Sequence, residues 1–360
     1  MTEIRAAVAG DLPGVVQLFL RAFRKDPNQS IDEMERYFRR LYFENPWVND
    51  ATPSIVAVEA DAITGFMGVV PLPVQLDGRS LRVAVGGNLM VDTDRGDPMA
   101  AMRIMRRYLG GGHDLAITDT ANVAALRLWM SLGASVARLQ TMRWLLPLRP
   151  ARLGLLALQR RRATSPLSWI GRPVASPVDR VLARKMTSGD DSLQAQTAAV
   201  SRVRSFTSVV GAKGYLHLDA QLEEWEWLID MCRTKQQYGP LQLEAYLDHT
   251  GRDVGVAAYY PSRGNIGQVV LLLALDGYHD AVLSSMCRQA SRNGCAALMG
   301  QGDPRLFIGL GSRASGYVQR NEFVVAHSSE AGLAAQATRG DVTLNRLVGE
   351  WWTRMQGDTF

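Results

Sequence analysis

Hydrophobic and polar positions alternate along the first third of the chain with two different periods. In two segments, at 12–23 and about 31–43, apolar residues recur every three or four positions, and Pro46 follows the second. Apolar residues then dominate three extended runs at 54–60, 65–76 and 81–91, with Asp77-Gly78 between the last two. A period near 3.6 is typical of helices, and Asp-Gly between two extended runs is typical of a hairpin. We therefore expect two helices followed by an antiparallel meander.

The pattern continues to about residue 146. Pro98 opens a segment in which Met99, Met102, Met105 and Leu109 share one face, and three glycines end it. Strand-like runs at 113–119 and 136–146 flank a helical segment at 122–132. With a short strand at 4–8, the predicted order is strand, helix, helix, three strands, helix, strand, helix, strand.

A similar order partly returns after about residue 197. A helix at 218–233 precedes strands at 241–247, 253–260 and 267–275, a helix at 278–293, a strand at 296–302, a short helix at 304–314 and a strand at 322–328. Because 360 residues exceed the usual size of one core, ~150, we predict two domains at 1–145 and 197–360. A basic, proline-containing linker at 146–196 joins them, and its part at 151–162 is expected to form a short helix. The predicted fold class is α/β.

Composition places the chain among ordinary globular proteins, with 47% apolar and 21% charged residues. We find no continuous apolar run of ~18 residues and no secretory signal, so we expect a cytoplasmic protein without a membrane span. The three cysteines lack paired spacing and the five histidines are scattered. We therefore predict neither a disulfide framework nor a metal site.

Positive charge is concentrated at 143–185, which holds ten Lys and Arg against the single Asp179. Such a segment is usually a solvated surface, and contact with nucleic acid or an anionic membrane is the minority outcome. We expect no nucleic-acid partner. A small-molecule partner is expected instead, and a homodimer is left open.

Two stretches of the first half carry candidate chemistry. Arg95-Gly96-Asp97-Pro98-Met99-Ala100 lies at the start of a predicted helix, where free amides and the helix dipole suit a diphosphate. The stretch at 122–134 reads NVAALRLWMSLGA. Its apolar positions form a helical stripe headed by an asparagine suited to an N-cap.

These stretches and the element order resemble the GNAT superfamily of acyl-CoA-dependent N-acyltransferases over residues 3–146. The second stretch is similar to the family's Asn-x-x-Ala-x-x-Leu-Tyr-x-x-Leu-Gly-Phe, with Trp129 in place of Tyr and Ala134 in place of Phe. The first is similar to Arg/Gln-x-x-Gly-x-Gly/Ala, with Pro98 at a glycine position. The resemblance implies acetyl-CoA or another acyl-CoA as cofactor. It assigns the cofactor contacts to Leu89, Met90, Val91, Arg95, Gly96, Met99, Ala100, Asn122 and Trp129.

Trp129 stands where the resemblance implies a tyrosine that protonates the leaving thiolate. An indole N–H donates a hydrogen bond but delivers no proton near neutral pH. Three alternatives stay open: the thiolate leaves unassisted, another group or water protonates it, or this half binds cofactor without turnover.

Acyl transfer to an amine also needs a base within reach of the acceptor nitrogen. Asp92, Asp119 and Glu59 are the candidates, because each is expected near the ends of the central strands. Gly86-Gly87 indicates a bulge or a close backbone approach, which the family uses to open a gap between its fourth and fifth strands.

The second half looks like a degenerate unit of the same kind, since its corresponding loop, LALDGYHDAV, has one glycine and two acids. The whole chain thus resembles tandem GNAT acyltransferases, with two units, each a mixed, mostly antiparallel sheet flanked by helices. The expected function is direct transfer of an acyl group, in a ternary complex, to an amine of a small acceptor bound between the halves. A non-catalytic acyl-CoA-binding protein and a Fem-type aminoacyl-tRNA-dependent transferase are the alternatives. The C-terminal LNRLVGEWW is interpreted as structural.

Overall fold

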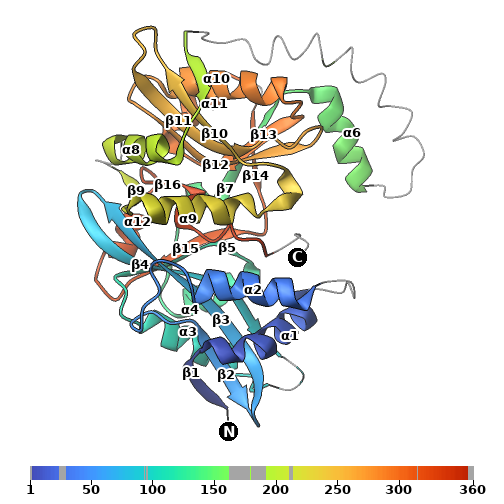
Figure 1. Ribbon diagram of the computed structural model, residues 1–360, viewed down its shortest axis with the longest axis vertical. Helices are drawn as coiled ribbons and strands as arrows, with labels where there is room; N and C mark the ends of the chain where they lie inside the picture. The colour runs from blue at the N-terminus through green and yellow to red at the C-terminus, as the bar shows by residue number, and fades with distance from the viewer. Residues whose placement is uncertain are drawn as a thin grey trace.

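The computed structural model describes residues 2–23, 30–92, 94, 96–161, 179, 192–210, 214–313 and 315–355. Two sheets, each flanked by helices, lie one above the other in Figure 1. This arrangement confirms the predicted α/β class with two mixed, mostly antiparallel sheets. Arg95 and most of the predicted linker lie outside the described residues.

The first sheet is built mainly by the first half of the chain. Its strands run in the order β1 (Glu3–Ala6), β2 (Ile55–Glu59), β3 (Ala62–Leu76), β4 (Arg79–Val91), β5 (Leu115–Ala121), β15 (Phe323–His327) and β6 (Ser135–Val136). β4 and β5 pair in parallel and the other neighbours in this order are antiparallel. After the 3-10 turn η1 (Ala9–Asp11), helices α1 (Leu12–Phe23) and α2 (Ile31–Tyr42) cover one face, and α3 (Ala100–Leu109) and α4 (Val123–Ser131) cover the other. The element order predicted for this half is confirmed up to β5 and α4.

Strand alternation explains this two-sided covering. Val70, Leu72 and Val74 of β3 pack in the core under α1 and α2, whereas Met67 and Val69 pack in the core under α3. Because successive side chains of a strand point to opposite faces, a strand buried on both sides is apolar at nearly every position. The long apolar run of β3 is the sequence signature of that position.

The second sheet repeats the strand order of the first. It runs β8 (Gln194–Thr197), β10 (Gln242–Leu247), β11 (Asp253–Tyr260), β12 (Ile266–Ala274), β13 (Ala297–Gln301), β7 (Met142–Pro147) and β14 (Gly316–Gln319). The parallel pair is now β12 and β13. This half also contains the helices α8 (Val200–Val210), α9 (Leu222–Arg233), α10 (His279–Arg292) and α11 (Phe307–Gly311), and the 3-10 turns η2 (Gln236–Tyr238) and η3 (Pro304–Leu306).

Each half of the chain gives at least one strand to the sheet of the other half. β7 inserts between β13 and β14 of the second sheet, and β15 inserts between β5 and β6 of the first. The prediction of one closing strand at 136–146 is therefore wrong: β6 ends at Val136, the short helix α5 (Arg138–Thr141) follows, and β7 crosses over. The predicted domain boundaries stay a prediction. Sheet membership does not follow them at β7 and β15, nor at β9 (Tyr215–Leu218) and β16 (Thr343–Leu344), which extend the first sheet from the second half.

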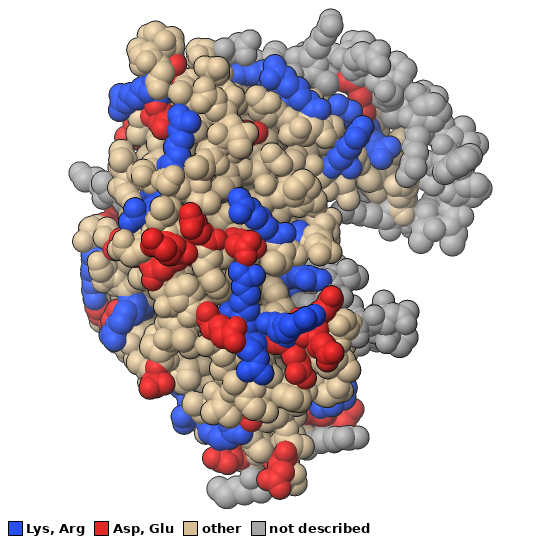
Figure 2. Space-filling view, viewed as in Figure 1, with Lys and Arg blue, Asp and Glu red and all other residues tan. Residues whose placement is uncertain are grey.

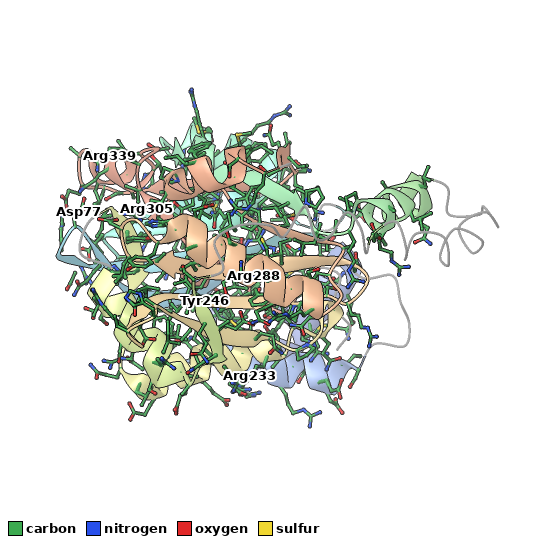
Figure 3. All side chains as sticks on the ribbon, turned by 90° about the horizontal axis from the view of Figure 1, so that it is seen from above. Asp77, Arg233, Tyr246, Arg288, Arg305 and Arg339 are labelled. Carbon is green, nitrogen blue, oxygen red and sulfur yellow. The ribbon has the colours of Figure 1, made fainter. Side chains whose placement is uncertain are left out.

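The two units share one hydrophobic core. One cluster of buried residues joins Phe38 of α2, Trp225 of α9 and Trp352 near the C-terminus, and β9 (Tyr215–Leu218) pairs with the end of β3. The turn between β3 and β4 has left-handed backbone at both Asp77 and Gly78, which confirms the predicted hairpin. The Asp77 carboxylate accepts a hydrogen bond from the Gly214 amide at 2.7 Å, and Figure 3 shows it on the same side as Arg339. The hairpin tip thus ties the first unit to the second.

The remaining elements frame this body. The helix expected at 151–162 is confirmed as α6 (Pro150–Arg161), whose first amides donate to the Asp179 carboxylate. After β15 the chain forms α12 (Leu333–Ala337), β16 (Thr343–Leu344) and η4 (Arg346–Val348). On the face shown in Figure 2, Lys and Arg side chains lie interspersed with Asp and Glu. Among the described helices none combines the length and apolar character needed to cross a bilayer.

Candidate active site

The candidate site is a fork between the two central strands of the first sheet. β4 and β5 pair from Val83 with Leu115 to Val85 with Ile117, and the register goes no further. On its other side β4 skips two positions against β3, since Gly87 pairs with Gly68 and Met90 with Phe66. The skipped residues are Asn88, whose φ is +52°, and Leu89. The bulge and the gap expected from Gly86-Gly87 are therefore both present.

A cavity of about 130 Å³ fills the fork. β4 contributes residues 86–89, β5 and α4 contribute the opposite wall, and the C-terminal segment closes the front. Its lining is Phe23, Met67, Gly86, Gly87, Asn88, Leu89, Thr118, Thr120, Ala121, Asn122, Ala125, Trp129, Lys235, Gln237, Tyr238, Glu322, Glu350, Trp351, Thr353 and Met355. Residues from both halves of the chain thus form one site.

Glu350 is the charged group that enters the fork from the C-terminal segment. Its Oε1 accepts hydrogen bonds from the hydroxyls of Thr118 and Thr120, both at 2.6 Å. Its Oε2 lies over Gly87, where a Cβ would come within 1.9 Å of that oxygen. A glycine is therefore required at this position of β4 for the carboxylate to fit.

Asp119 holds the backbone that carries Glu350. Its Oδ1 accepts hydrogen bonds from the amides of Glu350 at 2.7 Å and Trp351 at 3.0 Å, and its Oδ2 is buried without a hydrogen-bond partner among the described residues. Gly349 lies directly against this carboxylate, because a Cβ there would come within 2.2 Å of the Asp119 Cγ. The turn at 349–351 is thereby anchored to the end of β5.

Burial dominates the electrostatics of this pair of acids. Loss of hydration raises the pKa of Glu350 to about 7, and the neighbouring Asp119 charge acts in the same direction, while the two threonine hydroxyls oppose it. Burial also raises the pKa of Asp119, against the charges of Arg143 and Arg346. A carboxyl group with a pKa near neutrality is suited to take up and release a proton.

Asn122 and Trp129 lie where the sequence motif predicts. Asn122 caps α4, since its Oδ1 accepts a hydrogen bond from the Ala125 amide at 2.9 Å, and it lines the cavity. Trp129 is only 2% exposed and packs edge-on against Tyr108, with ring centroids 5.8 Å apart. No described residue accepts a hydrogen bond from its indole N–H. That donor is therefore unclaimed at the wall of the fork.

The start of α3 differs from the expected diphosphate cradle. The Met99 amide donates to the Asp97 carboxylate at 2.8 Å and the Ala100 amide to the Asp97 carbonyl at 2.9 Å. The Gly96 amide donates to the Asp92 carbonyl at 2.8 Å. The hydrogen bond from Met99 and the ion pair with Arg103 lower the pKa of Asp97, so an ionised carboxylate already occupies the helix start. Met99 is 54% exposed, so an anion has access but must displace this carboxylate.

Three further predicted positions follow the course of β4. Leu89 lines the fork. Met90 is buried in the core under α1 and α2, and Val91 packs on the opposite core. Of this trio the structure brings only Leu89 to the cavity.

The three predicted bases do not assemble at the fork. Glu59 and Asp92 line a separate cavity beside α1, where Asp92 pairs with Arg21 at 3.3 Å and Glu59 accepts a hydrogen bond from Thr2. Asp119 is next to the fork, but its carboxylate is engaged with the backbone of the C-terminal segment. The sequence pattern predicted the ends of the strands. It did not indicate Glu350, which lies beside Asp119 in the fold although the two residues are 231 positions apart in the chain.

One signal for Glu350 was present in the sequence. It is the only acid of the apolar stretch LNRLVGEWW, between Gly349 and Trp351. A glutamate in a segment otherwise fit for burial is costly unless it is paired or functional. Reading that stretch as merely structural overlooked this cost.

Comparison with known proteins rests on the fold. No protein-family model and no curated protein sequence matches the chain. The structure is similar to a GCN5-related N-acetyltransferase from Kribbella flavida, with a TM-score of 0.58 and 14% identity, over 94% of this chain and 74% of that one. It is also similar to a conserved protein of unknown function from Enterococcus faecalis described as a probable N-acyltransferase, with a TM-score of 0.59 and 11% identity, over 91% and 73%. A GCN5-related N-acetyltransferase from Anabaena variabilis gives 0.57 and 12%, over 90% and 72%.

At these identities the similarity establishes the fold alone. The chain has the GNAT fold in a two-unit arrangement, as the resemblance found in the sequence implies.

Proposed function

We propose that this protein is an acyl-CoA-dependent N-acyltransferase that uses acetyl-CoA and an amine of a small acceptor. The observation that carries the proposal is the fork itself, where β4 leaves β5 and bulges away from β3 beside a solvent-accessible cavity. The fold comparison supports the same reaction class. We also propose the cytoplasm as its location.

The backbone of the bulge supplies the chemistry that an acyl carbonyl requires. Asn88 and Leu89 have no counterpart in the register of β3, and the parallel register with β5 ends before them. Amides released from a sheet ladder are donors already held in position, and such donors stabilise the oxyanion of a tetrahedral intermediate. In the proposal the thioester lies along the fork with its carbonyl oxygen at these amides.

The acceptor amine approaches from the side of the C-terminal segment. Direct attack on the thioester forms the amide bond while the carbon–sulfur bond breaks, so both substrates are bound together. Trp129 offers its indole N–H to the departing sulfur, which stabilises a thiolate by a hydrogen bond without transferring a proton. Asn122 and Leu89 are proposed to line the path of the pantetheine arm.

The diphosphate of the cofactor is proposed to replace Asp97 at the start of α3. The amides of Met99 and Ala100 are available to an anion once the Asp97 side chain turns away, and the surface there is exposed. The present carboxylate makes this region a poorer anion site than an uncapped helix start. The thioester end of the cofactor therefore fits the structure better than its diphosphate does.

Binding is tested by thermal shift with acetyl-CoA and with S-acetylpantetheine, which lacks the diphosphate. Acetyl-CoA should raise the Tm in a dose-dependent manner, because a ligand that binds the native state stabilises it. Asp97→Asn keeps the oxygen that caps Met99 and removes the charge. It should enlarge the shift by acetyl-CoA and leave that by S-acetylpantetheine unchanged. Absence of any shift with either ligand contradicts the proposal.

A second candidate function is acyl-CoA binding without turnover. Trp129 favours it, since the position that could carry a general acid holds an indole. Release of free thiol from acetyl-CoA, measured with a panel of mono- and diamines, separates the two candidates. Thiol release that depends on the amine supports transfer, and binding without release with any amine supports the second candidate.

A further inference from the structure

We infer that Glu350 is the general base of this site, delivered to the first unit by the C-terminal segment and positioned there by Asp119. The inference rests on the proposed function, because it names the group that removes the proton from the acceptor amine.

The two oxygens of Glu350 have different surroundings. Both threonine hydroxyls donate to Oε1, which fixes the orientation of the carboxylate. Oε2 lies against Gly87, one residue before the bulge at Asn88. The free oxygen is thus next to the backbone at which the acyl carbonyl is proposed to bind, which is where a base must reach the attacking nitrogen.

The position of this carboxylate depends on contacts that serve no evident packing need. The Asp119 Oδ1 accepts hydrogen bonds from two amides of the C-terminal segment. Its Oδ2 is buried without a hydrogen-bond partner among the described residues. A buried acid left half-unsatisfied is costly, so its retention calls for a reason. Fixing the segment so that Glu350 enters the fork provides one, and Asp119 is therefore a positioning residue.

The titratable groups around Glu350 come from several elements. They are Asp119 of β5, Glu322 before β15, Tyr42 of α2, Tyr108 of α3 and Lys235 after α9, which lines the same cavity. The Lys235 ammonium donates to the Thr353 carbonyl at 2.9 Å and lies 5.0 Å from the Trp351 ring. Burial and the charges of Asp119 and Glu322 keep the pKa of Glu350 at about 7.

The ionised Glu350 takes one proton from the acceptor ammonium, and the neutral amine attacks the thioester carbon. The carbon–nitrogen bond forms, the carbon–sulfur bond breaks, and the sulfur leaves with the electron pair. The second proton of the nitrogen ends on the coenzyme A thiolate, and Glu350 returns its proton to water.

The test compares Glu350→Gln with Glu244→Gln in the full-length chain, using acetyl-CoA and the best amine found for the wild type. Glu244 is a matched control, since it is a buried glutamate that accepts hydrogen bonds from two hydroxyls, those of Tyr246 and Tyr259, inside the second sheet. Glu350→Gln should lower kcat/KM by about 10²–10⁴-fold, as loss of a general base does, and should still bind acetyl-CoA. Glu244→Gln should stay within about threefold of the wild type, since it lies outside the fork.

The pH profile of kcat/KM distinguishes a general base from a residue that only supports the structure, because only the base sets the position of its acid limb. For the wild type, kcat/KM should rise with pH through an acid limb near 7. Asp119→Asn keeps the oxygen that accepts the two amides but removes a charge that raises the pKa of Glu350, so the limb should move to lower pH. Thr118→Val removes a hydroxyl that stabilises the ionised form, so the limb should move to higher pH.

The outcomes separate this inference from the proposed function. Glu350→Gln with near wild-type kcat/KM and an unchanged limb overturns the assignment of the base while transfer itself stands. A wild type that binds no acetyl-CoA and releases no thiol overturns the proposed function. If Glu350→Gln does not fold, the pH profiles of kcat/KM for Asp119→Asn and Thr118→Val test the inference instead. Acid limbs that do not move in the stated directions overturn it.

Discussion

Both forks of this molecule form where a parallel strand pair diverges, but the space inside them differs. In the first, β4 and β5 diverge around a cavity of about 130 Å³ that contains the Glu350 carboxylate. In the second, β12 and β13 pair in parallel from Ile266 to Gln268 and then diverge in the same way, but the space between them is about 30 Å³. A water molecule needs roughly 10–15 Å³ of such space, so the second fork has room for a water or two but not for a substrate.

The second fork is closed by side chains from outside its own strands. Trp144 of the exchanged strand β7 lies directly over Gly300 of β13, where a Cβ would come within 2.3 Å of the indole. Thr343 and Leu344 of β16 line the remaining space, and Thr343 donates to the Asp303 carboxylate at 3.0 Å. β12 has a bulge at Val270, so the second fork has a bulged strand as the first does, although its cavity is smaller.

Strand order and a bulge create a fork in each sheet, and the neighbouring segments decide how much space stays open in it. In both forks a side chain packs directly on a glycine. Glu350 packs on Gly87 in the first fork, and Trp144 packs on Gly300 in the second. In the first fork, the group on the glycine is the carboxylate of Glu350, the end of a flexible side chain beside the cavity. In the second, it is a fully buried ring.

The largest expected effect comes from adding a methyl group at these two glycines. Gly87→Ala should displace the Glu350 carboxylate and lower kcat/KM about 100-fold or more, while the free energy of unfolding changes by about 1 kcal/mol or less, since only a side-chain tip must move. Gly300→Ala should destabilise the fold by about 1–3 kcal/mol, because the Trp144 ring cannot yield. Urea unfolding and steady-state kinetics of both variants check the pair. An equal loss of stability in the two variants would show that the side chains packed on Gly87 and Gly300 yield equally, contrary to the proposed difference between the forks.

The next effect is the dependence of stability on pH that Glu350 contributes in the first fork. The pKa of Glu350 is about 7 in the folded chain and 4.5 as an isolated group. The folded state therefore holds its proton more tightly, and stability relative to Glu350→Gln should fall as pH rises from about 4.5 to 7. The difference should reach about 3 kcal/mol above pH 7, at 1.36 kcal/mol per pH unit.

This difference is measured by urea unfolding of wild type and Glu350→Gln at pH 5 and pH 8. His113, whose pKa burial lowers to about 4, gives the opposite trend below pH 6.5, but it is common to both chains and cancels in the comparison. Parallel stability curves for the two chains would show that Glu350 titrates as an exposed acid does.

A smaller effect distinguishes the two asparagines that lie at the forks. Asn122 caps α4 in the first, and Asn345 caps η4 beside the second by accepting a hydrogen bond from the Leu347 amide at 2.9 Å. Substitution of either by alanine should cost about 1 kcal/mol of stability. Only Asn122→Ala should also reduce the thermal shift by acetyl-CoA. Loss of that shift in Asn345→Ala as well would give the second fork a role in binding.

The smallest expected effect is at Trp129. Trp129→Tyr introduces a phenol, whose ordinary pKa is about 10, at the wall of the first fork. It should raise kcat by roughly tenfold or less and add a decline in rate at alkaline pH, because the hydroxyl can protonate the leaving thiolate. Trp129→Phe, which removes the N–H and adds no acid, is the control and should lower kcat. No change in either variant would show that the sulfur does not contact this ring.

Much of the architecture could be read from local pattern. The helices α1 to α4, the hairpin at Asp77-Gly78 and the cap at Asn122 follow from periodicity and turn chemistry within a few residues of each position. The recurrence of a similar element order in the second half, and the identification of Gly86-Gly87 as the place where β4 opens, rest on the same local information.

Local patterns in the sequence therefore predict most elements of the first half and the strand beside which the candidate site lies, but not the division of 136–146 into β6, α5 and β7. Contacts between segments far apart in the sequence place β7 and β15 in the sheet of the other half and bring Glu350 into the fork. Pairing between strands and the burial of one glutamate are set by contacts across more than a hundred residues, whereas helix periods, turns and caps are set by neighbours along the chain.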